Sequence, residues 1–530
     1  MTQPSQAKRA YRCLYNHELL ILFTTESPYQ SYAEDVTARQ VEGYVRELQG
    51  TEVDALMCCP TAWKTPLYFS EVDRKWQDEA PGEVEPLHDC DARYPEKVYW
   101  RVRRYMLKGE DPVALSLKTA REIGIGFFLS YRMNDHHYNT LRDLRVHSRF
   151  WREHPEYAIR PEAVQGPGND SDLQLNYNHP EVQDYYRRII FELIDRYDID
   201  GFELDFMRTG RYFPDSEIEK GLSTMTAFVR TIRDKLRETG HKRGRPLLLC
   251  VRVPRTVELA EGMGLDLVTW SREDLIDMVN ASPHFRNNLD LDIEGFKHSL
   301  PGVRVYGETH FVTDAARLPS GFSNNINRRT TPTQYQTAAL SFLDRGADGL
   351  SFFNFAYTRH HYFGEPRRTQ LPGVEPPFHV LARICDEEYL RHLPKHYRKN
   401  PAIPPIPGEV GSVPLNIPAR GQGLVLMHIA DRFDASHSFT RALMRLESTA
   451  EIAGAPVVAF VNGRQIEPTY GLGELFPPLS AEGIPHYESL LFFEVPLDCL
   501  RHGLNEVVIH NHSTKGDTFE LRAVDLALYC

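Results

Sequence analysis

The sequence contains no long hydrophobic run, no excess of basic residues and no CxxC cysteine pair. A helix that crosses a membrane needs about 20 consecutive apolar residues, and no run of that length occurs. The net charge is -12, whereas a nucleic-acid-binding protein carries a basic surface. We therefore expect neither a membrane nor a nucleic acid as a partner.

The sequence also lacks the patterns of a secretory signal and of a metal site. Residues 1–9 are polar and the eight cysteines include no CxxC pair, which predicts a reduced, cytoplasmic protein; secretion of a longer precursor is the alternative. No HExxH motif or other spaced set of ligands is present. The adjacent histidines at 136–137 and 360–361 are expected to point to opposite faces of an extended chain. We therefore expect no metal and no cofactor.

The remaining composition is that of an ordinary globular protein. The chain has 530 residues, of which 41% are hydrophobic and 25% charged, enough for two or three domains. Apolar strands alternate with helical segments, and the expected strands are residues 10–15, 53–58, 124–131, 201–207, 246–253, 276–279, 303–306 and 347–354. This alternation predicts an α/β fold with parallel strands, and eight repeats favour a (β/α)8 TIM barrel over residues 1–398.

The pattern changes after a proline-rich stretch. Residues 399–408 contain four prolines and are expected to be a linker. Residues 409–530 then show short alternating strands separated by turns, with almost no helical pattern. This predicts a C-terminal antiparallel β-sandwich of the jelly-roll type. Two roles stay open for it: binding carbohydrate, and bracing the barrel or a homo-oligomer.

The stretch from Tyr197 to Arg208 contains two carboxylates on one face of a predicted strand. Residues of a strand point alternately to opposite faces, so Glu203 and Asp205 share one face while the apolar side chains share the other. Burying two unpaired carboxylates costs several kcal/mol. Catalytic residues of parallel barrels lie at the carboxyl ends of the strands, and we therefore expect an active site here.

Other polar residues follow the other predicted barrel strands. Carboxylates and a histidine at one end of a barrel can supply a general acid and a general base, as glycoside hydrolysis requires. Arginines from three strands could bind the anionic group of a sugar through paired hydrogen bonds. The candidate catalytic residues are Glu18, His137, Asp205 and Glu308; the candidate substrate-binding residues are Arg132, Asn134, Glu203, Arg208, Arg252 and Asn354.

Structural explanations compete with each of these roles. The arginines could neutralise the carboxylates instead of meeting a ligand, and Glu203 could form an ion pair inside the barrel. Glu308 could cap a helix or pair with His310. His137 could simply be hydrogen-bonded at the end of its strand.

Three short segments resemble known sugar-cleaving barrels. Residues 197–208, 270–277 and 346–350 are similar to glycosyl-hydrolase-like barrels related to family 10. The Gly-Phe-x-x-Asp spacing at 201–205 resembles the α-amylase clan, and this resemblance implies that Asp205 is the nucleophile, with Glu308 as the acid/base.

A closer resemblance is to the inverting exo-sialidases of glycoside hydrolase family 156. It covers residues 10–390 and implies that an acidic residue after the first strand and a histidine after the third handle protons. It also implies that arginines bind the carboxylate of the sugar. The matching positions are Glu18, His137, Arg132, Arg208 and Asn354; the family has Asp where this chain has Glu18.

The sequence therefore predicts an exo-acting glycoside hydrolase for a terminal anionic sugar of the sialic or uronic acid type. Its expected partner is an oligosaccharide or glycoside. A polysaccharide lyase and a non-catalytic glycan-binding barrel are the alternatives.

Overall fold

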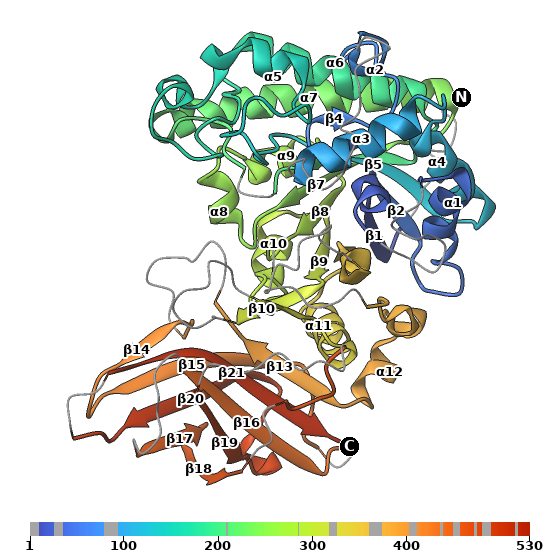
Figure 1. The fold of residues 1–530 in the computed structure, drawn as a ribbon. Coiled ribbons are helices and arrows are strands. Elements are labelled where there is room, and N and C mark those ends of the chain that lie inside the picture. The colour runs from blue at the N-terminus through green and yellow to red at the C-terminus, as the bar shows by residue number, and fades with distance from the viewer. Residues whose placement is uncertain are drawn as a thin grey trace.

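The computed structural model describes most of the chain and consists of a barrel followed by an antiparallel sheet domain (Figure 1). The described residues are 10–25, 35–78, 94–207, 210–284, 286–316, 326–359, 374–401, 411–434, 438–448, 456–470, 474–479, 489–514 and 518–530. All structural statements below concern these residues.

Eight parallel strands close into a barrel, as predicted from the alternating pattern. In barrel order the neighbours are β1, β12, β9, β8, β7, β6, β5 and β2, and β2 closes on β1. The strands are β1 (Cys13–Glu18), β2 (Ala55–Cys59), β5 (Gly126–Arg132), β6 (Gly201–Asp205), β7 (Leu248–Val253), β8 (Met278–Ala281), β9 (Arg304–His310) and β12 (Gly349–Phe353). Their carboxyl ends form one end of the barrel, called the mouth below.

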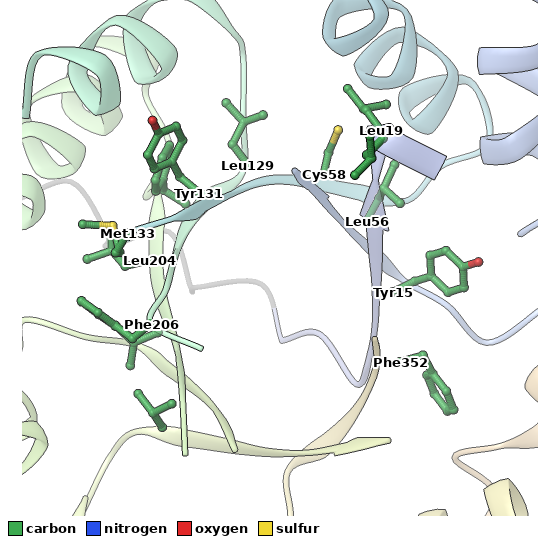
Figure 2. Packing of buried hydrophobic residues seen from close by; sticks show 14 of the residues in the cluster. Tyr15, Leu19, Leu56, Cys58, Leu129, Tyr131, Met133, Leu204, Phe206 and Phe352 are labelled. Carbon is green, nitrogen blue, oxygen red and sulfur yellow. The ribbon is translucent and has the colours of Figure 1, made fainter. Parts of the chain in front are cut away.

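Helices surround the barrel and shield the outward side chains of its strands. Figure 2 shows Tyr15, Leu129 and Phe352 outside the ring of strands, where they join the main hydrophobic core. The helices are α1 (Ala38–Arg46), α2 (Lys75–Asp78), α3 (Tyr94–Met106), α4 (Pro112–Glu122), α5 (Arg149–Glu153), α6 (Pro180–Arg196), α7 (Ile218–Arg243), α8 (Val257–Glu261), α9 (Leu267–Arg272), α10 (Ile293–Ser299), α11 (Pro332–Asp344) and α12 (Glu387–Arg391). Short 3-10 helices add to them: η1 (Leu19–Phe23), η2 (Pro155–Tyr157), η3 (Pro161–Val164), η4 (Asp215–Glu217), η5 (Phe355–Arg359) and η6 (Phe378–Arg383).

The inward side chains change from apolar to charged along the strands. Near the amino-terminal ends they form an apolar cluster that includes Leu14, Met57, Phe128, Met278 and Tyr306. Further along the same strands come polar side chains: Asn16, Ser130, Glu203, Asn280 and Ser351. At the carboxyl ends of the strands, which form the mouth, the side chains are charged. A closed apolar base below a charged mouth confines chemistry to the carboxyl end, as is usual for this fold.

The structure contains elements that the sequence pattern did not predict. These elements are helix α3 and, after β9, a hairpin of β10 (Val312–Ala316) and β11 (Ile326–Arg329). The expectation that His136 and His137 point to opposite faces is wrong: their rings stack with centroids 4.8 Å apart. These residues lie in a turn beyond β5, so the alternation of an extended strand does not apply to them.

The C-terminal domain is an antiparallel β-sandwich, as predicted. Its strands follow the order β13, β21, β16, β19, β18, β17, β20 and β15, with β14 paired to β21. Their bounds are β13 (Lys395–Lys399), β14 (Leu415–Ile417), β15 (Gln422–Ile429), β16 (Arg441–Ser448), β17 (Val457–Val461), β18 (Arg464–Thr469), β19 (Ser489–Glu494), β20 (Gly503–Asn511) and β21 (Phe519–Tyr529), with η7 (Leu497–Cys499) before β20. Strand β13 pairs with β21 and precedes the proline-rich stretch, most of which lies outside the described residues.

Buried polar contacts hold the sandwich against the barrel, and Figure 1 shows it beside α10, α11 and β10. The Asn400 side chain donates to the backbone oxygens of Thr313 (2.6 Å) and Asn287 (3.1 Å). Glu447 of β16 accepts from Arg328 of β11 at 3.0 Å. Two connections that leave the mouth, those after β8 and β9, are therefore anchored on the sandwich.

Candidate active site

One arginine links two of the predicted carboxylates in the mouth. Arg252 donates from Nε and Nη2 to the two oxygens of Glu308 (2.6 and 2.8 Å), and from Nη1 to Asp205 (3.0 Å). Ser282, directly after β8, donates to Glu308 at 2.6 Å. Asp205 is 2% exposed, Glu308 is fully buried, and the Arg252 guanidinium lies 3.7 Å from the centre of the Phe353 ring. Burial raises the pKa of Glu308, although Arg252 and Ser282 offset part of that effect.

Glu203 lies deeper in the barrel and accepts no hydrogen bond from an arginine among the described residues. Ser130 donates to one of its oxygens at 2.6 Å, and Cys250 and Asn280 approach the other at 3.4 Å. Burial raises the pKa of Glu203 to about 7, and the negative charge of Asp205 adds to that effect. The competing idea that Glu203 pairs directly with an arginine therefore does not describe its contacts.

A second chain of polar contacts runs from β1 to the turn after β5. Arg132 donates to Glu18 and, from Nη1, to Asp135 at 3.0 Å. Asp135 in turn bonds the backbone and the Nδ1 atom of His137, both at 2.8 Å. The Tyr357 hydroxyl donates to the other oxygen of Glu18 at 2.7 Å. Glu18 and His137, which are far apart in the sequence, are thus joined through one arginine and one aspartate.

The charges around Asp135 determine its protonation state. Burial alone would raise its pKa, but His137, Lys64 and Arg132 together hold the pKa of this carboxyl well below its usual range. Lys64 lies 3.8 Å from the carboxylate, and burial lowers the pKa of Lys64 to about 8. Asp135 therefore remains ionised, and orients the imidazole of His137. The His137 side chain is 18% exposed, more than any carboxylate named above.

Both predicted asparagines lie near the mouth but differ in their contacts. Asn134 holds two segments together, since its amide donates to the backbone oxygens of Leu175 (2.8 Å) and Arg211 (2.6 Å). Asn354 follows β12 with a φ of 54°, and its buried side-chain oxygen has no hydrogen-bond partner among the described residues. Asn354 is therefore the better placed of the two to contact a ligand.

Several residues that make these contacts were not predicted from the sequence, and one predicted residue cannot be placed. Arg208 lies outside the described residues. Ser282 could have been found because it lies three residues beyond the predicted strand 276–279, whereas Lys64 had no signal because it belongs to the short turn between β3 (Thr61–Ala62) and β4 (Thr65–Pro66). Within the described residues, no group of three or more His, Cys, Asp or Glu side chains is arranged to hold a metal ion.

No protein-family model and no curated protein sequence matches the chain. Among solved structures, an α-L-fucosidase isoenzyme 2 from Paenibacillus thiaminolyticus matches 72% of this chain and 50% of its own, at 13% identity and a TM-score of 0.38. Isoenzyme 1 from the same organism matches over 98% and 97% of the two chains, at 12% identity and a TM-score of 0.36. A maltogenic α-amylase from Thermotoga neapolitana matches over 93% and 98%, at 10% identity and a TM-score of 0.38. This chain thus spans half the length of the first of these structures, and at such low scores none of them bears on its activity.

Proposed function

We propose that the protein is a glycoside hydrolase whose acid–base pair is Glu18 and His137. The observation that carries the proposal is the chain of contacts Glu18–Arg132–Asp135–His137 at the mouth of a closed parallel barrel. Glycoside hydrolysis needs one group that protonates the leaving oxygen and a second that activates water or attacks the sugar. Two proton-exchanging side chains held at one mouth meet that requirement.

We propose a role for each member of the pair from its contacts. The Arg132 guanidinium stabilises the ionised form of Glu18, so that Glu18 is the group that accepts a proton from water. The ionised Asp135 stabilises the imidazolium form of His137 through Nδ1, which makes Nε2 the atom that delivers a proton to the leaving oxygen.

Asp205 and Glu308 support a different role in this scheme. Both are almost completely buried and bind the same guanidinium. A nucleophile must contact the sugar carbon directly, so a carboxylate held in this way would first have to leave Arg252. Glu18 is equally buried and also bound to an arginine, but a general base acts through a water molecule and needs no such contact. We therefore assign Asp205, Glu308 and Arg252 to shaping the mouth and its electric field, and we do not adopt the amylase-like roles.

The preferred substrate in this proposal is a terminal sugar with an anionic group. Arg132 and Arg252 place two guanidiniums in the mouth, from β5 and β7. Both are paired with carboxylates, as the competing structural explanation expected, so a sugar carboxylate must compete with Glu18 or Asp205 for them. Such competition would raise the proton affinity of the displaced carboxylate and so strengthen it as a base, which couples the charge of the substrate to the proton chemistry.

A panel of aryl glycosides tests the proposal. The panel contains sialic, glucuronic, galacturonic and neutral sugars, and release of the aryl group is followed by absorbance. We expect turnover of an acidic sugar without an unsaturated, ultraviolet-absorbing sugar product. Turnover confined to neutral sugars contradicts the anionic preference, an unsaturated product identifies a lyase, and no turnover of any glycoside contradicts the proposed function.

A further inference from the structure

A second hollow lies between the barrel and the sandwich. Its volume is about 550 Å³, which falls in the range of about 300–1,000 Å³ that is typical of small-molecule sites. The barrel side consists of the loop after β7, the segment leading into α10, and Arg345 after α11; the sandwich side comes from β13, β15 and the start of β20. None of the four candidate catalytic residues lines this hollow, which we call the junction cavity.

The charges of the junction cavity balance and are largely paired. Its lining contains four basic residues (Arg255, Arg345, Arg398 and Lys399) and four acidic ones (Glu258, Asp290, Asp292 and Glu294). Arg345 pairs with Glu294 at 2.5 Å, and Lys399 pairs with Asp290 at 2.7 Å. An ion that entered the cavity would have to break one of these pairs and face a like charge. The cavity therefore offers many hydrogen-bonding groups but little net charge, which favours a neutral, polar ligand.

The sandwich side of the junction cavity adds an apolar surface. Leu426 and His428 alternate to the same face of β15, and His428 is paired in register with Leu504 of β20. Leu504 is 51% exposed, an unusual position for a large apolar side chain that lines a hollow. A ligand with hydroxyl groups along its edge and C–H groups on its face can contact both surfaces at once.

We infer that the junction cavity binds neutral, hydroxyl-rich sugar residues of an oligosaccharide. It lies on the connections that follow β7 and β8, the strands that bring Arg252 and Ser282 to the mouth. The cavity thus holds a part of the glycan away from the bond that is cleaved. This role rests on the proposed function, whereas the binding itself requires no catalysis.

Ligand-observed saturation-transfer NMR and calorimetric titration test the inference on the full chain. The probes are neutral trisaccharides: cellotriose, maltotriose, xylotriose and chitotriose. We expect at least one to bind, and we expect the double variant Glu258→Ala/Leu504→Ala to weaken that binding about tenfold, which corresponds to about 1.4 kcal/mol. Glu258 and Leu504 are both exposed, so the fold should tolerate their truncation.

The matched control is Leu424→Ala, two residues before Leu426 on the same face of β15 but outside the junction cavity. Its trisaccharide affinity should equal that of the unmodified protein, and thermal unfolding of all variants checks that they are folded. No binding of any trisaccharide overturns the inference. Binding of inorganic phosphate without binding of sugars also overturns it, because the cavity would then be an anion site.

The remaining outcomes separate this inference from the proposed function. If binding is lost in Glu18→Gln but kept in the double variant, the sugar occupies the mouth and the inference is wrong. If binding depends on Glu258 and Leu504 while no glycoside is hydrolysed, the junction cavity stands and the proposed function fails. If glycosides are hydrolysed and the double variant binds trisaccharides normally, the proposed function stands and the inference about the junction cavity fails.

Discussion

Two groups of buried charges, one where the sandwich meets the barrel and one inside the barrel, differ in their ratio of cations to carboxylates. At the junction, Asp525 of β21 accepts from Arg398, Arg445 and His396, and Glu447 accepts from Arg328 and Arg398. Each carboxylate there has at least two cations. In the barrel, Asp205 and Glu308 share the single cation Arg252, and Glu203 lies beneath them.

This difference in balance sets the proton affinity of the carboxyl groups. Burial alone would raise every one of these pKa values. The surplus of arginines holds the pKa of Asp525 well below its usual range and lowers the pKa of Glu447 to about 2. In the barrel the pKa of Glu308 stays raised, and that of Glu203 rises to about 7. Permanently charged groups suit a structural joint, whereas the raised pKa values in the barrel follow from two carboxylates that share one cation above a third carboxyl group.

Removing the junction carboxylate should have the largest effect on stability. Asp525→Asn leaves Arg398, Arg445 and His396 without their shared anion, and breaking a buried pair costs about 3–5 kcal/mol. Urea-induced unfolding, followed through the transition that involves the sandwich, measures this loss. The matched control is Asp498→Asn, whose partner Arg464 is a solvent-exposed arginine of the same domain. We expect no measurable change in the control, because exposed pairs contribute little; equal losses in both variants would remove the contrast between the two kinds of site.

The pH dependence of stability should differ in sign between the two groups. Glu447 and Asp525 have depressed pKa values, so the stability they provide is present above their unfolded-state values and is lost as the pH falls towards about 2. Glu203 has a raised pKa, so its contribution is fully present at low pH and is lost as the pH rises from about 4.5 to about 7.

The variant Glu203→Gln sharpens this contrast. It should remove that decline and make the protein more stable above pH 7 by roughly 3 kcal/mol, because position 203 then carries no carboxyl group that has to ionise inside the barrel. Unfolding measured across this pH range checks the change, with Glu261→Gln on the exposed end of α8 as the control. An unaltered pH slope in Glu203→Gln would show that another group titrates there.

The smallest expected effect concerns a single hydrogen bond in the mouth. Tyr357→Phe removes the hydroxyl that donates to Glu18 at 2.7 Å. A bond of this kind to a charged group contributes about 1.5–3 kcal/mol when it is buried, and less at this half-buried site, so we expect kcat/KM to fall by about tenfold. Steady-state kinetics on the glycoside found in the panel measures it, with Tyr389→Phe on α12 as the control. Unchanged kinetics in Tyr357→Phe would indicate that Glu18 has no role in the reaction.

Much of the architecture was predictable because it depends on local periodicity. The alternation of strands and helices predicted the barrel, and the strand pattern after residue 409 predicted the sandwich. The two faces of β6 follow from a period of two, so that Glu203 and Asp205 were correctly placed on the inward face. The turn after β5 was not predictable in this way, which is why the stacking of His136 on His137 was missed.

The pairing of charges in the mouth could not be predicted from the sequence. Arg132 reaches Glu18 across 114 residues, and Arg252 reaches Glu308 across 56. The sequence placed each of these residues at the end of a strand, but the strand order and the side-chain directions decide which arginine meets which carboxylate. The candidate roles of Glu18, His137, Asp205 and Glu308 therefore stay predictions, although their neighbours are now known.

The most direct test compares Glu18→Gln with Asp205→Asn in the same glycoside assay. Both changes remove one carboxylate from the mouth with little change in size. Our account predicts that Glu18→Gln lowers kcat/KM by about 10²–10⁴-fold, as expected for loss of a general base, while Asp205→Asn retains more activity. Full activity of Glu18→Gln together with complete loss of turnover in Asp205→Asn would contradict the account and favour a nucleophilic Asp205.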